Sequence, residues 1–183
     1  MRKMPKTVSV TAFFLMLVLL NACASGLQSS KSRQSSEGKS TEINSYQPNQ
    51  LESEVLSGVN AARISGYKCG GVYFPPVGKL RANQELSRAA MSQARSMAST
   101  GVFSHVGVRG DTVGDRISAT GYNWKACGEN IAAGQMTPKQ VVAGWLRSPG
   151  HCKNIMNGDY FEMGIAYAKT RKTTYWAQTF GAR

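Results

Sequence analysis

Residues 163–180 read MGIAYAKTRKTTYWAQTF, and this stretch decides the class of fold. Residues 163–168 and residues 173–180 are rich in apolar, β-branched and aromatic side chains, which is typical of β-strands. The connection between them, Lys169-Thr170-Arg171-Lys172, is short and polar. Two strand-like runs joined in this way predict an antiparallel hairpin at the C-terminal end of the sequence.

Upstream of this hairpin, apolar residues recur at helical spacing. The first such set predicts a helix and consists of Leu51, Val55, Val59 and Ala62. A second helix is predicted from about residue 83 to residue 99, with an inner stripe of Leu86, Ala89, Ala90, Ala94, Met97 and Ala98. The small side chains of this stripe imply close packing against a neighbouring element.

A further helix begins at Thr137-Pro138-Lys139-Gln140. Threonine can cap the helix, proline fits its first position, and glutamine completes a capping box. Val141, Val142, Trp145 and Leu146 would form its inner face, and Ser148-Pro149-Gly150 should end it. Helices therefore come first and strands last, so the predicted fold class is α+β. The region from residue 51 to residue 183 is long enough for one domain with its own core.

The N-terminal region predicts export. A basic tip precedes an apolar run of about 13 residues, which is shorter than the roughly 20 that cross a bilayer as a helix and fits a secretory signal. Leu20-Asn21-Ala22-Cys23 resembles the lipobox of bacterial lipoproteins, which implies that Cys23 receives a diacylglycerol after cleavage. An ordinary signal peptide with an incidental cysteine is the alternative.

The predicted organisation has three parts. Residues 1–22 are the lipoprotein signal peptide, residues 23–50 are the lipidated cysteine and a flexible polar tether, and residues 51–183 are the folded domain. The predicted location is the bacterial cell envelope, where Cys23 holds the protein on a membrane. Ala24 is compatible with the outer membrane if the host is Gram-negative.

The charge balance favours anionic partners. The chain has 22 basic and 10 acidic residues, and the signal peptide carries three of the basic ones, so 19 against 10 leave a net charge of +9. Such a charge suits lipid headgroups or anionic wall polymers. Nucleic acid is not expected as a partner, because the protein is exported and carries no recognition motif. A basic surface without a dedicated partner is the alternative.

Two histidines and one acid are the candidates for chemistry. His105 and His151 are the only histidines, and each is expected in a turn between elements; Glu129 lies in Gly128-Glu129-Asn130-Ile131. Together they could bind a divalent metal such as zinc, or share protons in a polar cleft. Hydrogen bonding with a purely structural role is the alternative for each. Asn130 is expected to organise the turn after Glu129.

Three cysteines remain once Cys23 is assigned to the lipid. They are Cys69, Cys127 and Cys152, and an exported protein is expected to form one disulfide among them and keep one thiol. Their spacing does not decide which two pair.

The ordered motifs of residues 51–183 resemble the CAP superfamily, which comprises cysteine-rich secretory proteins, antigen 5 and pathogenesis-related proteins. The motifs are Phe103-Ser104-His105, Gly128-Glu129-Asn130-Ile131, residues 145–151, Asn154-Ile155-Met156 and Tyr175-Trp176-Ala177-Gln178. The bacterial branch, with Ser-Pro-Gly-His followed by Asn-Ile-Met, is the most similar. The resemblance implies a three-layer α-β-α sandwich with an antiparallel central sheet and one open cleft. It also favours a disulfide between Cys69 and Cys152.

Many members of this superfamily place two histidines and two glutamates in the cleft. The resemblance carries over His105 and Glu129, but Ser148 stands where the second glutamate belongs and Tyr175 where the second histidine belongs. His151 is the histidine typical of the bacterial branch. The candidate cleft therefore comprises His105, Glu129, His151, Ser148 and Tyr175. Trp145, Trp176 and Tyr175 are expected to lie mostly in the core.

The leading functional hypothesis is a non-enzymatic binding module of the cell surface or envelope, with a lipid, sterol, wall or protein ligand. The incomplete set of four cleft residues argues against demanding catalysis. One alternative is a metal-assisted hydrolase or peptidase, in which His105 and His151 hold the metal and Glu129 acts as a ligand or general base. A third is a structural envelope protein. The ligand and the oligomeric state are left open.

Overall fold

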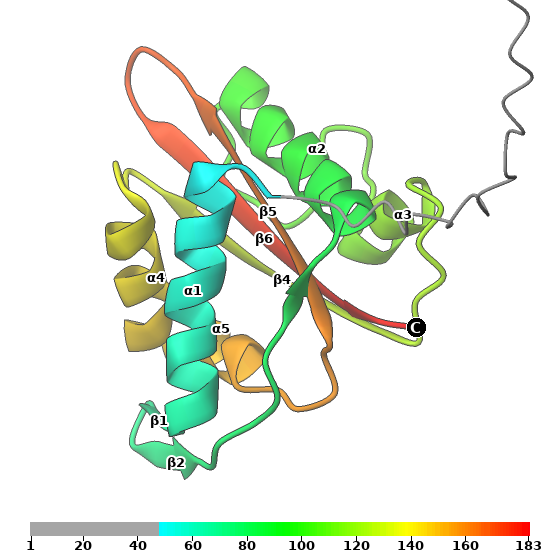
Figure 1. Ribbon diagram of the computed structural model, residues 1–183. Coiled ribbons are helices and arrows are strands. Elements are labelled where there is room, and N and C mark those ends of the chain that lie inside the picture. Colours follow the sequence, from blue (N-terminus) through cyan, green and yellow to red (C-terminus); the bar gives the residue numbers. More distant parts are fainter. Residues whose placement is uncertain (1–47) are drawn as a thin grey trace, which may run out of the picture. The chain divides into compact units, whose positions relative to one another are not determined.

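The computed structural model describes residues 48–183 (Figure 1). The helices are α1 (Gln50–Ser65), α2 (Gln84–Thr100), α3 (Val113–Ser118), α4 (Pro138–Arg147) and α5 (Pro149–Ile155). The strands are β1 (Tyr67–Cys69), β2 (Val72–Phe74), β3 (Arg81–Ala82), β4 (Ala126–Ala133), β5 (Glu162–Lys169) and β6 (Thr174–Ala182). The predictions on the signal peptide, Cys23 and most of the tether lie outside the described residues. Within residues 48–183, no helix is long and apolar enough to cross a membrane.

The central sheet has the strand order β3-β5-β6-β4. β5 and β6 pair antiparallel, with Glu162 opposite Gly181 and Lys169 opposite Thr174, so the predicted hairpin is confirmed. β4 pairs antiparallel with the other side of β6. The expectation of an antiparallel sheet is wrong at one edge, because β3 runs parallel to β5. β3 leads directly into α2, and this fixes its direction: Asn83 caps α2 and donates its N–H to Met163 O.

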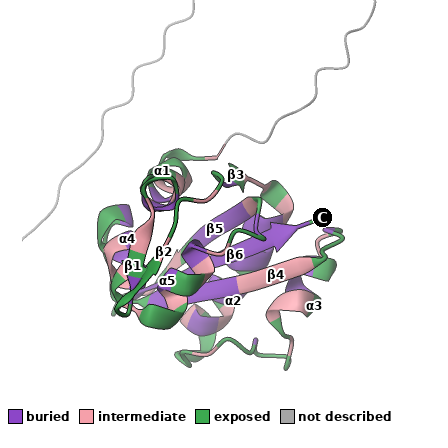
Figure 2. Cartoon of the chain, turned by 90° about the horizontal axis from the view of Figure 1, so that it is seen from below, coloured by how far each residue is buried: buried purple, intermediate pink, exposed green. Residues whose placement is uncertain are grey.

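Helices cover both faces of this sheet (Figures 1 and 2). α2 packs along β5 and β6 on one face, and α1, α4 and α5 lie on the other. The approach of α2 is close: a Cβ atom at Gly164 of β5 would lie 2.0 Å from Ser87 N, so only glycine fits there. Thr179 of β6 also donates its hydroxyl to Leu86 O at 2.7 Å. The predicted α-β-α layers and the close packing of the second helix are confirmed.

The predicted capping box of α4 is present. Thr137 Oγ1 accepts the N–H of Gln140, and Gln140 Oε1 accepts the N–H of Thr137, each at 3.2 Å. α4 ends at Arg147 as predicted, but Pro149 then begins α5. The prediction that His151 lies in a turn is therefore wrong, since it lies in the first turn of α5. Proline lacks an N–H and has a helical φ, so the residue that stops one helix also starts the next.

Strand β4, which carries the Gly-Glu-Asn-Ile motif, was not predicted. Its central residues Glu129 and Asn130 are polar but buried, so the strand lacks the alternation by which strands are recognised. β4 is also an edge strand, and side chains from other elements cover its outer carbonyl groups. The donors are Tyr160 Oη to Cys127 O, Asn154 Nδ2 to Glu129 O, and Trp145 Nε1 to Ile131 O, each at 3.1 Å.

A disulfide joins Cys69 of β1 to Cys152 of α5, which confirms the pairing that the family resemblance implied. Cys127 is the free, half-buried thiol. β1 and β2 form an antiparallel hairpin, with Tyr67 opposite Phe74 and Cys69 opposite Val72. Closing 83 residues should stabilise the fold by about 4 kcal/mol through the entropy of the unfolded chain.

The buried guanidinium of Arg63 in α1 binds four backbone carbonyl groups. It donates to the oxygens of Gly78 (2.6 Å), Ile155 (2.6 Å), Asn157 (2.8 Å) and Tyr160 (3.1 Å). Burial lowers the pKa of Arg63, yet the group stays charged because its ordinary pKa is so high. The disulfide and the core clusters of residues 48–183 lie in one compact unit, so we expect these residues to fold as a unit.

Candidate functional site

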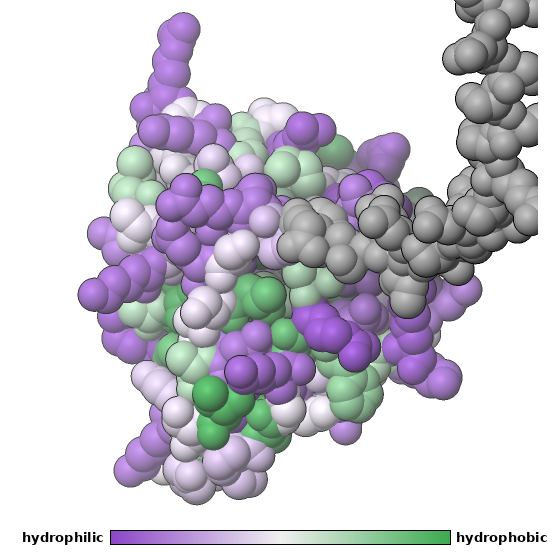
Figure 3. All heavy atoms as spheres, viewed as in Figure 1, coloured by the Kyte–Doolittle hydropathy of each residue, from purple (hydrophilic) through white to green (hydrophobic). Residues whose placement is uncertain are grey.

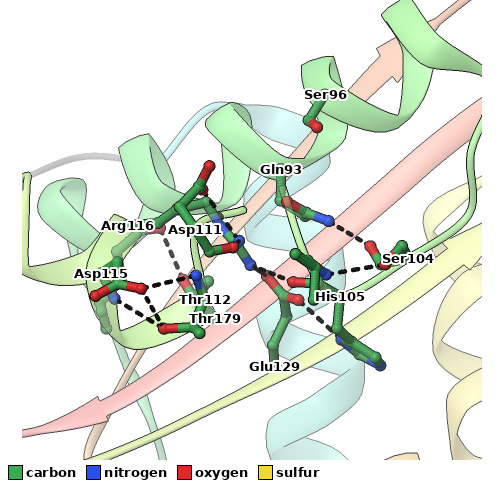
Figure 4. Close-up of polar contacts among 12 residues, drawn as sticks. Gln93, Ser96, Ser104, His105, Asp111, Thr112, Asp115, Arg116, Glu129 and Thr179 are labelled. Carbon is green, nitrogen blue, oxygen red and sulfur yellow. Dashed lines mark hydrogen bonds and ion pairs between the residues drawn. The ribbon is translucent and has the colours of Figure 1, made fainter. Parts of the chain in front are cut away.

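Three side chains from separate elements meet over β4 (Figure 4). Glu129 comes from β4, Arg116 from α3, and His105 from the loop after α2. Glu129 Oε1 lies 2.9 Å from His105 Nδ1, and Glu129 Oε2 accepts from Arg116 Nη2 at 2.7 Å. The carboxyl group is buried, and each of its oxygens has its own partner. The structure thus brings together two of the residues that the sequence singled out, His105 and Glu129.

Arg116 was not predicted as a site residue. Its guanidinium also donates to Asp111 O at 2.9 Å, to Asp111 Oδ2 at 3.3 Å and to His105 O at 3.2 Å. It therefore ties both ends of the loop between α2 and α3 to the carboxylate. The capping box of Thr112 and Asp115 fixes the start of α3 and so the position of Arg116. No sequence feature separates this arginine from the other basic residues, because its partners are assembled only by the fold.

The loop that carries His105 is anchored to α2. Gln93 donates its amide to Ser104 O, and Ser96 Oγ accepts the N–H of Val108 at 2.9 Å. Within the loop, Ser104 Oγ accepts the N–H of Val106 at 3.0 Å. The backbone is thus held in place while the His105 side chain is 56% exposed. Because Nδ1 faces a carboxylate, neutral His105 carries its proton there and leaves Nε2 as an acceptor.

His151 lies on the other side of β4. Successive residues of a strand point to opposite faces, so Glu129 faces α3 while Asn130 faces α5. Asn130 donates to His151 O and to Gln178 Oε1, both at 3.1 Å, and accepts from Asn154 at 2.9 Å. The prediction that Asn130 organises a turn is wrong, because it connects β4 to β6 and α5. Burial first, and His105 second, lower the pKa of His151, so its ring is neutral at pH 7.

The predicted metal site does not fit this arrangement. Among residues 48–183, no group of three or more His, Cys, Asp or Glu side chains is placed to hold a metal ion. His105 and Arg116 engage both oxygens of Glu129, and a cation at this carboxylate would lie beside the positive guanidinium. The site that the sequence proposed for His105, His151 and Glu129 therefore lacks a set of free donors.

A small pocket lies across the edge of β4. Its volume is about 310 Å³, and its lining is Phe103, Ile131, Ala132, Ala133, Gln135, Gly144, Trp145, Ser148 and His151. The structure therefore brings two further predicted residues, Ser148 and His151, to one pocket. Tyr175 is elsewhere: it is buried with Ala90, Ala94 and Met97 of α2. Trp145, Trp176 and Tyr175 are core residues, as expected.

Cys127 does not form a reactive centre. Burial, together with the negative charge of Glu129, raises the pKa of the Cys127 thiol. Within the described part of the chain, no histidine side chain is hydrogen-bonded to a hydroxyl or thiol group. The thiol is therefore protonated and unactivated at neutral pH.

A larger groove, of about 670 Å³, lies between α1 and α4. Its lining includes Gly58, Tyr67, Val142 and Leu146, together with the charged residues Glu54, Lys139 and Arg147. On the face that Figure 3 shows, hydrophilic side chains dominate and hydrophobic ones form separate small areas. Sequence reasoning did not identify this groove, because it depends on how two distant helices pack.

Comparison with known proteins identifies the family. Residues 75–180, more than half of the chain, match the family model of CAP, the cysteine-rich secretory protein family. This chain belongs to the CAP family. The His105–Glu129 contact and the pocket across β4 are therefore features of a CAP domain.

Relatives of this CAP domain occur in several bacteria. The Bacillus subtilis protein YkwD is 34% identical over 101 residues, which are 55% of this chain and 38% of YkwD. An extracellular protein with an SCP domain from Bacillus anthracis has a similar structure, with a TM-score of 0.63 and 24% identity over 74% of this chain and 41% of that one. An outer surface protein from Borrelia burgdorferi also has a similar structure. Its TM-score is 0.58 and its sequence identity is 22%, and the match covers 70% of this chain and 90% of that one.

These likenesses confirm the predicted fold and the bacterial branch of the family. The chain spans less than half of YkwD and of the Bacillus anthracis protein, so these relatives contain further regions. The two structural neighbours are extracellular or surface proteins.

Proposed function

We propose that this protein is exported, anchored through lipidated Cys23, and acts as a binding module of the cell surface or envelope. The observation that carries this proposal is the state of Glu129: it is buried, and His105 and Arg116 engage its two oxygens at 2.9 and 2.7 Å. A carboxylate held in this way positions the His105 loop and is not free to serve as a metal ligand or general base. The pocket beside it can bind a ligand without activating a nucleophile.

The anchor and tether suit this role. The lipobox-like Leu20-Asn21-Ala22-Cys23 would place the chain on a membrane, and a polar tether of 27 residues would give the domain a root-mean-square reach of roughly 30 Å. Surface and extracellular relatives support export. The positive charge would hold the domain near anionic lipids or wall polymers.

The binding role can be tested on residues 48–183. We would measure co-sedimentation with isolated cell-wall sacculi and with phospholipid vesicles, with and without sterol, for the wild-type domain and for His151→Ala and Ser148→Ala. We expect saturable binding to one of these materials that both changes weaken. Equal binding by all three proteins, or no binding at all, would contradict the proposed site. Retention of full-length Cys23→Ser in the membrane fraction would contradict lipid anchoring.

A second candidate, a hydrolase, is favoured by the His105–Glu129 contact. The carboxylate orients the imidazole and leaves Nε2 exposed, as a general base requires. A substrate hydroxyl or a water molecule would then have to supply the nucleophile. Turnover of a labelled peptide or wall fragment that His105→Ala abolishes would favour this candidate over simple binding.

A further inference from the structure

The pocket across β4 contains no fixed charge, although the protein is strongly basic. No Lys, Arg, Asp or Glu lines it, and its one titratable residue, His151, has a lowered pKa and is neutral at pH 7. Neither an anionic headgroup nor a metal ion finds a counter-charge there. The pocket therefore suits a neutral ligand.

An exposed aromatic ring stands at this pocket. Phe103 is 54% exposed although it lines the cavity. Its backbone is held on both sides, since Thr100 Oγ1 accepts the N–H of Val102 at 3.2 Å and Gln93 donates to Ser104 O. A flat apolar face on a fixed loop loses little entropy when a ligand packs on it. The C–H face of a sugar ring is a suitable partner for such an aromatic surface.

The polar groups of the pocket are those that bind hydroxyl and amide groups. Ser148 and neutral His151 can each donate and accept a hydrogen bond. Gln135 adds a carboxamide whose Oε1 is buried and has no partner in the structure. An unpaired buried acceptor is costly, so a rotation of the carboxamide that turns Oε1 into the pocket, where a ligand N–H can satisfy it, would be favourable. Apolar Ile131 and Trp145 complete the lining.

The size of the pocket limits the ligand. At about 310 Å³ it lies at the lower end of the roughly 300–1,000 Å³ range of ligand pockets, which suits one sugar ring better than a sterol or an acyl chain. We propose that this pocket binds an N-acetylated amino sugar of a wall-type glycan. The ring lies on Phe103, and the acetamide N–H donates to the rotated carboxamide of Gln135. This inference rests on the proposed binding function and names its ligand.

The test uses residues 48–183 and calorimetric titration with triacetylchitotriose. Cellotriose, which has the same rings without acetamide groups, and the fully deacetylated, cationic chitosan trimer are the comparison sugars. We expect saturable binding of the acetylated trimer only. Phe103→Ala should weaken it about tenfold through the lost stacking surface. Gln135→Ala should weaken it about fivefold through the lost amide contact.

Phe161→Ala is the matched control, because Phe161 is 57% exposed but does not line the pocket. Its affinity should stay within twofold of the wild type. Equal binding of cellotriose, or an unchanged affinity in Phe103→Ala, would overturn the inference. So would the absence of trimer binding; the co-sedimentation assays would then still decide the broader binding role. A wall disaccharide carrying its peptide, titrated in parallel, distinguishes a bacterial-wall source from a chitin-like one.

Discussion

Two buried arginines serve two regions of this domain in different ways. Arg63 of α1 lies against the end of α5 and the segment after it, and it binds only neutral backbone carbonyl oxygens. Arg116 lies where α3 meets β4, and its partners include the carboxylates of Glu129 and Asp111. Both are almost fully buried, at 1% and 4% exposure.

The difference lies in what each guanidinium holds. Arg63 satisfies carbonyl groups that the chain would otherwise bury without donors, so it fixes the path of the backbone from residue 155 to residue 160. Arg116 neutralises Glu129 beside a half-exposed histidine, so it fixes a functional group at an open surface. Burial alone therefore does not reveal the role of a charged residue, whereas its partners do.

Removing the disulfide that ties β1 to α5 should give the largest effect. The Cys69→Ser/Cys152→Ser variant should lose about 4 kcal/mol of unfolding free energy, because the unfolded chain gains the entropy of an open 83-residue loop. Urea unfolding measures this loss. Cys127→Ser is the control and should lose less than about 1 kcal/mol. Equal losses in the two proteins would show that the α1–α5 region does not depend on this crosslink.

Arg63→Met should cost about 3 kcal/mol, because it leaves four carbonyl groups with no donor. Arg95→Met, at an exposed position of α2, should change stability by less than about 0.5 kcal/mol. If Arg63→Met does not fold, Arg63→Lys should fold with an intermediate loss, since lysine replaces some of the bonds. A loss in Arg63→Met as small as that in Arg95→Met would remove the structural role assigned to Arg63.

Arg116→Met should cost about 3 kcal/mol, the lower end for a broken buried pair, because it removes the cation from buried Glu129 while His105 stays beside the carboxylate. Adding Glu129→Gln should recover part of this loss, since a neutral amide needs no counter-charge. A double-mutant cycle in urea measures the coupling. If the two losses simply add, the carboxylate does not depend on Arg116 and the contrast with Arg63 fails.

The smallest expected effect is a pH dependence from His151. Burial holds the folded-state pKa of His151 below its ordinary value of about 6.5, so the unfolded chain binds more protons as the pH falls below that value. Stability from this group should be complete above that pH and decline towards the folded-state pKa. His151→Gln should show a shallower decline between pH 7.5 and pH 5.5. An unchanged slope would show that His151 is not the titrating group.

Local elements were largely predictable from the sequence. The C-terminal hairpin, the stripe of α2 and the capping box of α4 arise from neighbours within a few residues, and the structure confirms all three. Strand β4 and helix α5 were not predicted, because neither is indicated by its own neighbouring residues. The side chains that donate hydrogen bonds to β4 lie 14 to 33 residues away in the chain. α5 begins at Pro149, which the sequence analysis interpreted only as the end of the preceding helix.

The candidate site was predictable only in part. His105 and Glu129 were identified by motif, and their contact is confirmed, whereas Arg116 and Gln135 gave no signal. The sequence also placed Tyr175 in the cleft. Tyr175 does share a face of the sheet with Glu129, since Ala133 pairs with Tyr175 and Glu129 with Thr179, but Ala90, Ala94 and Met97 of α2 cover it. A side chain within a predicted strand is thus located only when the helix that covers its part of the sheet is known.

The sequence by itself determined the fold class, most helices, the hairpin and the family. Helical periodicity and capping depend on residues a few positions apart, and the family motifs are short segments in a fixed order. Tertiary structure alone decided which polar groups meet. Arg63 reaches acceptors more than 90 residues away, and Glu129 meets His105 and Arg116 across three elements. The physical reason is that a buried charge takes its role from the partners the fold brings to it, and these partners are not its neighbours in the chain.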